Sequence, residues 1–247
     1  MTFTRGIGLR VLLAMVCVLA VSCATRGPRG KKPGVAPVAA EFTPVSFVSP
    51  IHVESGAYGN LYASDSYAVW ANPEVAALKK AQAVEAGETV DPKLETLGQA
   101  FNDNFLVFEC HLVSAFADTS IGYDAVGLRG ADVYLLTADG RAVRPIQMAM
   151  AGPVRETPQG ALKKFERVNL VVFPRRDVAT GVPTVDSGSR AARLVIEAVQ
   201  TKFYFEWASL RAPTRPAAPT MEDRLRAVKL GFNEFYRKLL AGAHIFD

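Results

Sequence analysis

The stretch from Phe105 to Phe116, FLVFECHLVSAF, decides the fold that this chain is expected to adopt. Its even-numbered positions are mostly apolar, and its odd-numbered positions include Glu109 and His111. Since successive side chains of a strand point to opposite faces, this alternation predicts a half-buried β-strand with Cys110 inward and His111 outward. The two neighbours therefore cannot pair as nucleophile and base. We interpret Cys110 as core packing and His111 as a surface or intersheet hydrogen-bonding residue.

A hairpin follows in residues 133–148, VYLLTADGRAVRPIQM. Asp139-Gly140 lies between two β-prone runs and predicts a type I′ turn, in which both central residues have positive φ. Pro145 has no backbone N–H, so we expect the second strand to be an edge strand or to end early. Residues 151–163 are interpreted as a loop.

The next strand is expected at 165–173, which is followed by a turn-rich loop at 174–190. A last strand pair is expected within 192–210, ARLVIEAVQTKFYFEWASL, where the apolar positions change parity. This change predicts a bulge or a break near Gln200.

Helices are expected before and after these strands in the sequence. Asn72-Pro73 and Asp91-Pro92 each combine a capping side chain with a proline suited to the first helical turn. They predict one helix that runs to about Ala86, before Gly87, and a second that leads through Leu94, Leu97 and Phe101, which are spaced for one helical face. Near the C-terminus, Thr220 and Asp223 resemble a capping box. One amphipathic helix ending at Gly242 is expected after it, from an apolar stripe formed by Leu225, Val228, Phe232, Phe235 and Leu239. The stripe is expected to dock on the sheet, with a partner-binding or membrane-surface helix as the alternative.

The strand pattern predicts a mainly β fold with flanking helices. It resembles the immunoglobulin-like domains of unknown function carried by many bacterial surface lipoproteins, in the pieces Phe105–Phe116, Leu135–Gly140 and Val171–Pro174. The resemblance covers roughly residues 100–210 and implies an antiparallel β-sandwich. We expect an irregular and helical part at 42–103 and the sandwich at 104–210. A Pro-rich connection and the C-terminal helix, packed on the sandwich, are expected at 211–247.

The first residues have the layout of an export signal. Arg5 and Arg10 precede an apolar run of eleven residues, Val11–Val21, which is too short to span a membrane, since that takes about 20 residues. The sequence Ala20-Val21-Ser22-Cys23 resembles the lipobox of bacterial lipoproteins, although that family most often has Leu where this chain has Ala20. The resemblance implies a signal peptide at 1–22, cleavage before Cys23 and attachment of diacylglycerol to its thiol. An ordinary cleaved signal with an incidental Cys is the alternative.

A tether is expected at residues 23–41, which contain three prolines and four basic residues. The basic residues suit either a solvated spacer or contact with anionic head groups. The resemblance to lipoproteins also implies that Ala24, rather than Asp, after Cys23 directs sorting to the outer membrane, if the cell has one, on its periplasmic or surface side. The chain has 28 Lys and Arg against 24 Asp and Glu, and six of the cations lie before residue 35. The remainder is therefore slightly acidic, which argues against a nucleic-acid partner.

The chemistry-bearing residues form no recognisable catalytic, cofactor or metal motif. Besides Cys17 and Cys23 the chain has one thiol, Cys110, so no disulfide is expected in the domain. His52, His111 and His244 lack metal-ligand spacing. Three turn carboxylates lack the regular spacing of a calcium loop: Asp118, Asp124 and Asp132. Four aromatic residues suit either a binding groove or packing under a loop: Tyr58, Tyr62, Tyr67 and Trp70.

These observations favour a non-catalytic, membrane-anchored binding or assembly module of the bacterial envelope, with a protein partner. Two alternatives remain open. One is an envelope hydrolase with an unrecognised active site, and the other is a carrier of a small apolar ligand between sheet and C-terminal helix.

Overall fold

The computed structural model describes residues 42–56, 65–115, 126–159, 162–177, 179–186, 188–198, 201–209 and 218–242. Several residues singled out from the sequence lie outside these ranges: Cys17, Cys23, Tyr58, Tyr62, Asp118, Asp124 and His244. Within the described part of the chain, no helix is long and apolar enough to cross a membrane.

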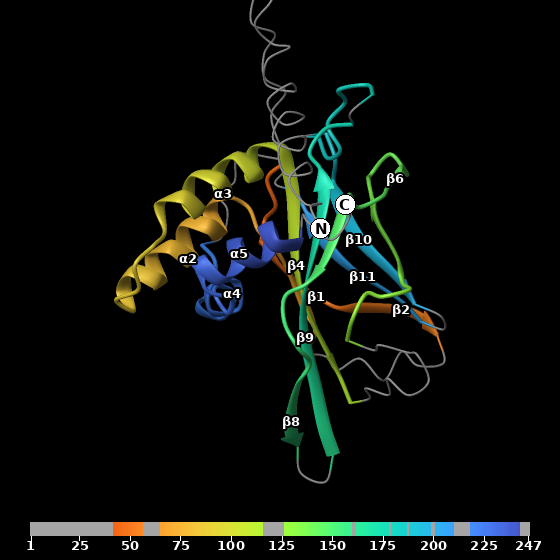
Figure 1. Cartoon of the computed structure of the whole chain (residues 1–247). Helices are drawn as coiled ribbons and strands as arrows, with labels where there is room; N and C mark the ends of the chain where they lie inside the picture. The colour runs from red at the N-terminus through yellow and green to blue at the C-terminus, as the bar shows by residue number, and fades with distance from the viewer. Residues whose placement is uncertain are drawn as a thin grey trace, which may run out of the picture. The chain divides into compact units, whose positions relative to one another are not determined.

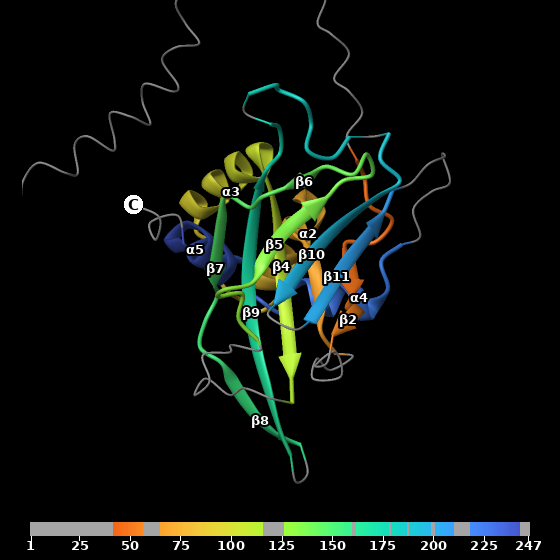
Figure 2. The ribbon, with the colours of Figure 1, turned by 90° about the vertical axis from the view of Figure 1, so that its right-hand side faces the viewer.

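Two antiparallel sheets pack against each other (Figures 1 and 2). The first sheet has the order β1-β3-β4-β9-β7, with β8 also paired to β9. Its strands are β1 (Val48–Pro50), β3 (Tyr67–Trp70), β4 (Phe105–Ser114), β7 (Gln147–Met150), β8 (Arg155–Gln159) and β9 (Leu162–Pro174). The second sheet has the order β2-β11-β10-β5-β6. Its strands are β2 (His52–Gly56), β5 (Asp132–Leu136), β6 (Ala142–Val143), β10 (Ala191–Ala198) and β11 (Thr201–Ala208). The mainly β architecture predicted from the strand pattern is confirmed.

The main core lies between the two sheets and is rich in aromatic side chains. Phe108 of β4 is fully buried and contacts Trp70, Phe173 and Trp207, with ring centroids 4.8 to 5.7 Å apart. The even-numbered apolar residues of β4 all belong to this core, as the alternation predicts: Leu106, Phe108, Cys110 and Leu112. The interpretation of Cys110 as core packing is confirmed.

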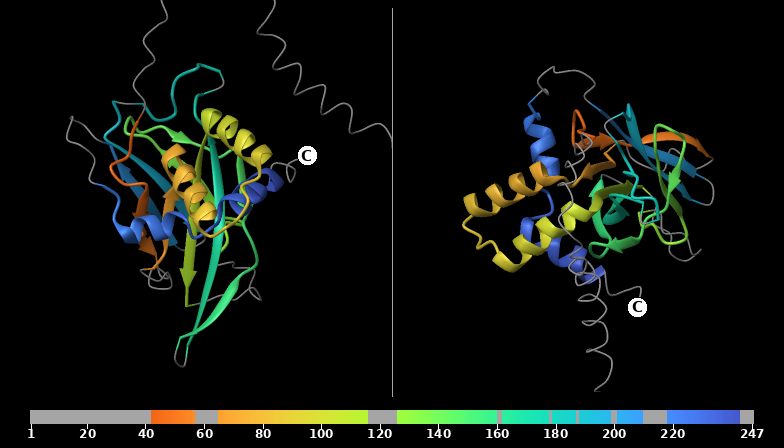
Figure 3. Two further views of the ribbon diagram at one scale, coloured as in Figure 1. Left: turned by 90° about the vertical axis from the view of Figure 1, so that its left-hand side faces the viewer. Right: turned by 90° about the horizontal axis from the view of Figure 1, so that it is seen from above.

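Four helices complete the fold: α2 (Pro73–Glu85), α3 (Pro92–Asn104), α4 (Met221–Ala227) and α5 (Phe232–Gly242). They lie together on one side of the sandwich (Figure 3). A second core, which includes Val107, Leu170, Phe235 and Leu239, joins α2, α3 and α5 to the outer face of the first sheet. Ala227 of α4 packs in a third cluster with Val69 and Val75. Strand β4 is therefore buried on both faces, and the prediction of a half-buried strand is wrong.

Local capping explains where α2 and α3 begin. The side chains of Asn72 and Asp91 accept hydrogen bonds from the N–H groups of Val75 and Lys93, and a proline takes the first turn of each helix. After α2, Gly87 has φ of 75°, a conformation that side chains rarely allow. The predicted starts of both helices and the stop after α2 are confirmed.

The C-terminal segment is broken into two helices, so the prediction of one continuous helix is wrong. The capping box of Thr220 and Asp223 begins α4 as predicted, but α4 ends at Ala227 and α5 begins at Phe232. Leu225, the first residue of the predicted stripe, is 55% exposed, whereas the residues of α5 dock on the sheet. Within the break, the backbone carbonyl of Leu230 accepts a hydrogen bond from Lys79 of α2.

The hairpin between β5 and β6 has a longer turn than predicted. The N–H of Gly140 donates to the carbonyl of Thr137, and the N–H of Thr137 donates to that of Arg141. Gly140 has φ of 83°, whereas no described residue other than glycine has positive φ. The turn is therefore a three-residue loop with glycine in the left-handed conformation, and the type I′ prediction is wrong. The edge position and early end of β6, before Pro145, are confirmed.

Two further predictions concern the remaining strands. Strand β8 occupies part of 151–163, so the interpretation of that stretch as a loop is wrong. Its residues are too polar to show a buried face, and only pairing with β9 makes them a strand. The break predicted near Gln200 is confirmed, because β10 ends at Ala198 and its partner Thr201 begins β11.

Candidate functional site

The polar face of β4 carries two ionisable residues that are sealed beneath the helices. Glu109 and His111 point away from the intersheet core, and both are 0% exposed. The interpretation of His111 as a surface or intersheet residue is therefore wrong, because α2, the α4–α5 connection and α5 cover that face. Charged groups in such a place must be paired, since burial of an isolated charge is costly.

Lys79 of α2 supplies the first partner. Its Nζ lies 3.0 Å from Glu109 Oε2, donates to the Leu230 carbonyl at 2.5 Å, and lies 5.1 Å from the ring centroid of Phe235. Burial lowers the pKa of Lys79, and Glu109 opposes that change. Burial raises the pKa of Glu109, but Lys79 and His111 together outweigh it and lower that pKa. Glu109 is therefore ionised and paired.

His111 continues the chain of polar groups toward the surface. Its Nε2 lies 2.6 Å from Glu109 Oε1. Because an ionised carboxylate only accepts hydrogen bonds, Nε2 carries the proton and donates. The ring stacks on Tyr67, its cross-strand partner, at a centroid distance of 4.4 Å. Its other nitrogen, Nδ1, is buried and has no hydrogen-bond partner among the described residues.

Glu166 and Lys229 end this chain at the protein surface. Glu166 Oε1 lies 3.9 Å from His111 Nδ1, which is too long for a hydrogen bond, and is in direct contact with Lys229 Nζ. His111 and Lys229 lower the pKa of Glu166 to about 2, against the effect of burial. Lys229 is the partner in direct contact with the Glu166 carboxylate. We call the five residues Lys79, Glu109, His111, Glu166 and Lys229 the charge chain.

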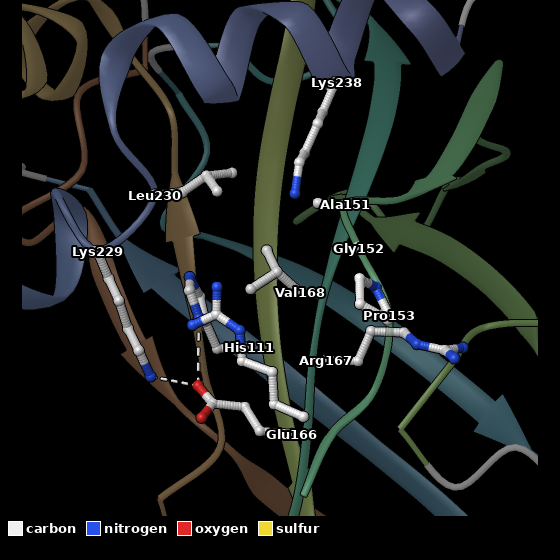
Figure 4. Close-up of a pocket in the computed structure, with 11 residues that line it drawn as sticks. His111, Ala151, Gly152, Pro153, Glu166, Arg167, Val168, Lys229, Leu230 and Lys238 are labelled. Carbon is white, nitrogen blue, oxygen red and sulfur yellow. Dashed lines mark hydrogen bonds and ion pairs between the residues drawn. The ribbon is translucent and has the colours of Figure 1, made fainter.

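A small pocket opens beside the outer end of the charge chain (Figure 4). It has a volume of about 50 Å³ and lies between the β7–β8 junction, β9 and the α4–α5 connection. Figure 4 shows Lys238 reaching from α5 toward Ala151 and Gly152, while Glu166 lies between His111 and Lys229. Its lining includes charged and titratable residues from separate parts of the chain: His111, Arg155, Glu166, Lys229 and Lys238.

The other residues singled out from the sequence are dispersed. Tyr67 and Trp70 are buried, which favours packing over a binding groove for these two. Asp132 forms an ion pair with Arg144 on the surface, and His52 stacks on Tyr204. Burial raises the pKa of the Cys110 thiol, which therefore stays protonated. Within the described residues, no group of three His, Cys, Asp or Glu side chains is placed to hold a metal ion.

Sequence reasoning missed Lys79, Glu109, Glu166 and Lys229 as a group. One signal was present, because Glu109 and His111 occupy the same face of a strand that is otherwise strongly apolar. The other members lie far away in the chain, so only the folded structure brings them together.

The ionisation of Glu166 makes stability depend on pH. A folded pKa of about 2, below the unfolded value of about 4.3, means that the carboxylate stabilises the fold above about pH 4.5. This contribution is lost as the pH falls toward 2. For Glu166→Gln we expect a loss of about 1 kcal/mol at pH 6, a value reduced by solvent screening of the exposed pair, and almost none at pH 2.

Urea denaturation followed by tryptophan fluorescence at several pH values measures this difference. Glu156→Gln is the matched control, because Glu156 pairs with Lys163 at an exposed position of the β8–β9 hairpin. A Glu166→Gln difference that does not change between pH 6 and pH 2 would contradict the assignment.

Comparison of the chain with protein-family models, with curated proteins and with solved structures finds no match.

Proposed function

We propose that this protein is a non-catalytic, lipid-anchored binding or assembly module of a bacterial cell envelope. The proposal places its anchor at Cys23, in the outer membrane on the periplasmic or surface side, and assigns it an envelope protein as partner. It also assigns the sandwich to the immunoglobulin-like domains of bacterial lipoproteins, on the motif pieces in residues 100–210.

The burial of the inner residues of the charge chain is the observation that supports a non-catalytic role. Lys79 is 1% exposed and Glu109 and His111 are 0% exposed, so no substrate can reach them in this conformation. A hydrolase using His111 would need a nucleophile within hydrogen-bond reach of its ring. Its ring nitrogens instead face two carboxylates, and the Cys110 thiol lies on the opposite face of β4. The inner members of the charge chain, Lys79, Glu109 and His111, therefore join the helices to the first sheet.

The space between sheet and C-terminal helix bears on the carrier alternative. An apolar ligand there would need a cavity between α5 and β9 or β4. Closely packed side chains occupy that interface, including Leu170, Val172, Phe235 and Leu239, all at most 1% exposed. This packing favours a binding role at the surface over carriage of a ligand within the fold.

Site-specific photo-crosslinking in cells tests the binding role. A photoreactive residue is introduced at one exposed position on each of three faces: Val84 of α2, Thr157 of β8 and Val182 of the loop before β10. We expect one face to give a discrete adduct of defined mass in the membrane fraction, and the other two, which serve as matched controls, to give none. Absence of a discrete adduct from all three faces would count against the binding role.

A further inference from the structure

We propose that the pocket beside Glu166 binds a phosphate group, as inorganic phosphate or as a phosphate monoester. The inference goes beyond the proposed function and does not depend on the lipid anchor. It rests on the convergence of cationic side chains on a small space and on an unpartnered nitrogen of His111 at its inner wall.

Four cationic residues line the pocket against the single carboxylate of Glu166: Arg155, Arg167, Lys229 and Lys238. Arg155 is the direct cross-strand partner of Glu166, so the two side chains lie on the same face of the sheet. Lys238 reaches in from α5, and its Nζ lies 3.2 Å from the position that a Cβ on Gly152 would occupy. Lys229 already neutralises Glu166. The charges of Arg155 and Lys238, the latter shared with Glu234 at 2.8 Å, therefore remain available to an anion.

The size of the pocket suits a small tetrahedral anion. Its volume is about 50 Å³, whereas a single water molecule needs roughly 10–15 Å³ measured in the same way. It is too small to enclose a large ligand, so a longer molecule would place only its charged end group inside.

His111 distinguishes phosphate from other anions. Its Nε2 donates to Glu109, and its Nδ1 is buried without a hydrogen-bond partner among the described residues. In the proposed complex the ring is the neutral tautomer protonated at Nε2, which presents a lone pair at Nδ1. A ligand must then donate to Nδ1 while accepting from Arg155 and Lys238. A phosphate monoester, whose second pKa is about 6, carries P–OH and P–O⁻ groups near neutral pH and provides both. Sulfate and carboxylates are fully ionised there and provide only acceptors.

Isothermal titration calorimetry of the full chain in detergent, with inorganic phosphate as the probe at pH 6.5, tests the proposal. We expect saturable binding of one phosphate per chain, and much weaker binding of sulfate at the same ionic strength. Lys238→Gln and Arg155→Gln should each raise the Kd about tenfold, because each removes a charge-assisted hydrogen bond.

Lys163→Gln is the matched control and should leave the Kd unchanged, since Lys163 pairs with Glu156 outside the pocket. Absence of saturable phosphate binding, equal binding of sulfate, or an equal effect of Lys163→Gln would each overturn the proposal. Monomeric dihexanoyl phosphatidic acid distinguishes the sources of the phosphate. Tighter binding than inorganic phosphate, lost in Lys238→Gln, identifies a lipid headgroup, and equal or weaker binding identifies a soluble phosphate.

Discussion

Replacement of Lys79 by methionine is expected to lower the free energy of unfolding by about 3–5 kcal/mol, a large part of the stability of a typical domain. Methionine fills most of the volume of the lysine side chain but leaves Glu109 buried without its ammonium partner. The substitution also removes the hydrogen bond to the Leu230 carbonyl, which holds the connection between α4 and α5. The cost therefore arises from an uncompensated buried charge and not from lost volume.

Lys80 provides a matched control one residue away in the same helix. It also pairs with a glutamate, Glu95, but its side chain is 44% exposed. Because an exposed ion pair contributes little, Lys80→Met should change the free energy of unfolding by less than about 1 kcal/mol. Urea denaturation of both variants at pH 7 gives the comparison. Equal effects of the two substitutions would show that burial does not set the strength of the Lys79–Glu109 pair.

The double variant Lys79→Met/Glu109→Gln separates the charge from the packing. Glutamine keeps a hydrogen bond to His111 and removes the unpaired charge that Lys79→Met leaves behind. We expect the double variant to lose less stability than the sum of the two single variants, with a coupling energy of about 1–3 kcal/mol. Additive losses would mean that the two residues do not interact in the folded protein.

Replacement of Cys23 by serine is expected to remove the protein from the membrane fraction and to abolish incorporation of labelled palmitate. The reason is chemical, since a serine hydroxyl does not replace the thiol that the lipobox resemblance implies as the acceptor of diacylglycerol. Each buried CH₂ of an acyl chain contributes about 0.8 kcal/mol, and two or more chains hold a protein stably where one does not. Loss of the anchor should therefore shift nearly all of the protein to the soluble fraction.

Cys17→Ser is the matched control for this experiment. Cys17 lies in the apolar run of the predicted signal, six residues before Cys23, and follows Val16, which is not a small residue. The variant should keep both the label and the membrane association. Continued labelling of Cys23→Ser, or loss of labelling in Cys17→Ser, would contradict the assignment of the anchor to Cys23.

Local signals predicted those features that depend on near neighbours in the chain. The alternation in β4 correctly separated Cys110 from His111, and the capping side chains correctly marked the starts of α2 and α3. Both patterns reflect backbone geometry within a few residues. Predictions failed where a distant segment decided the result, as in β8, which is a strand because it pairs with β9. The Asp-Gly pair alone also failed to predict the length of the turn between β5 and β6.

The sequence by itself determined the two faces of β4, the mainly β architecture and the burial of Cys110. The reason is that side-chain alternation and apolar character depend only on the residues of the strand itself. Only the tertiary structure decided what covers the polar face. Glu109 and His111 belong to β4, Lys79 to α2, and Glu166 and Lys229 to segments much later in the chain. Burial beneath the helices excludes water from the inner members and forces these charges to pair with one another. The same packing brings the Leu230 carbonyl, in the break of the C-terminal segment, to Lys79 and leaves a small cationic pocket at the outer end of the charge chain.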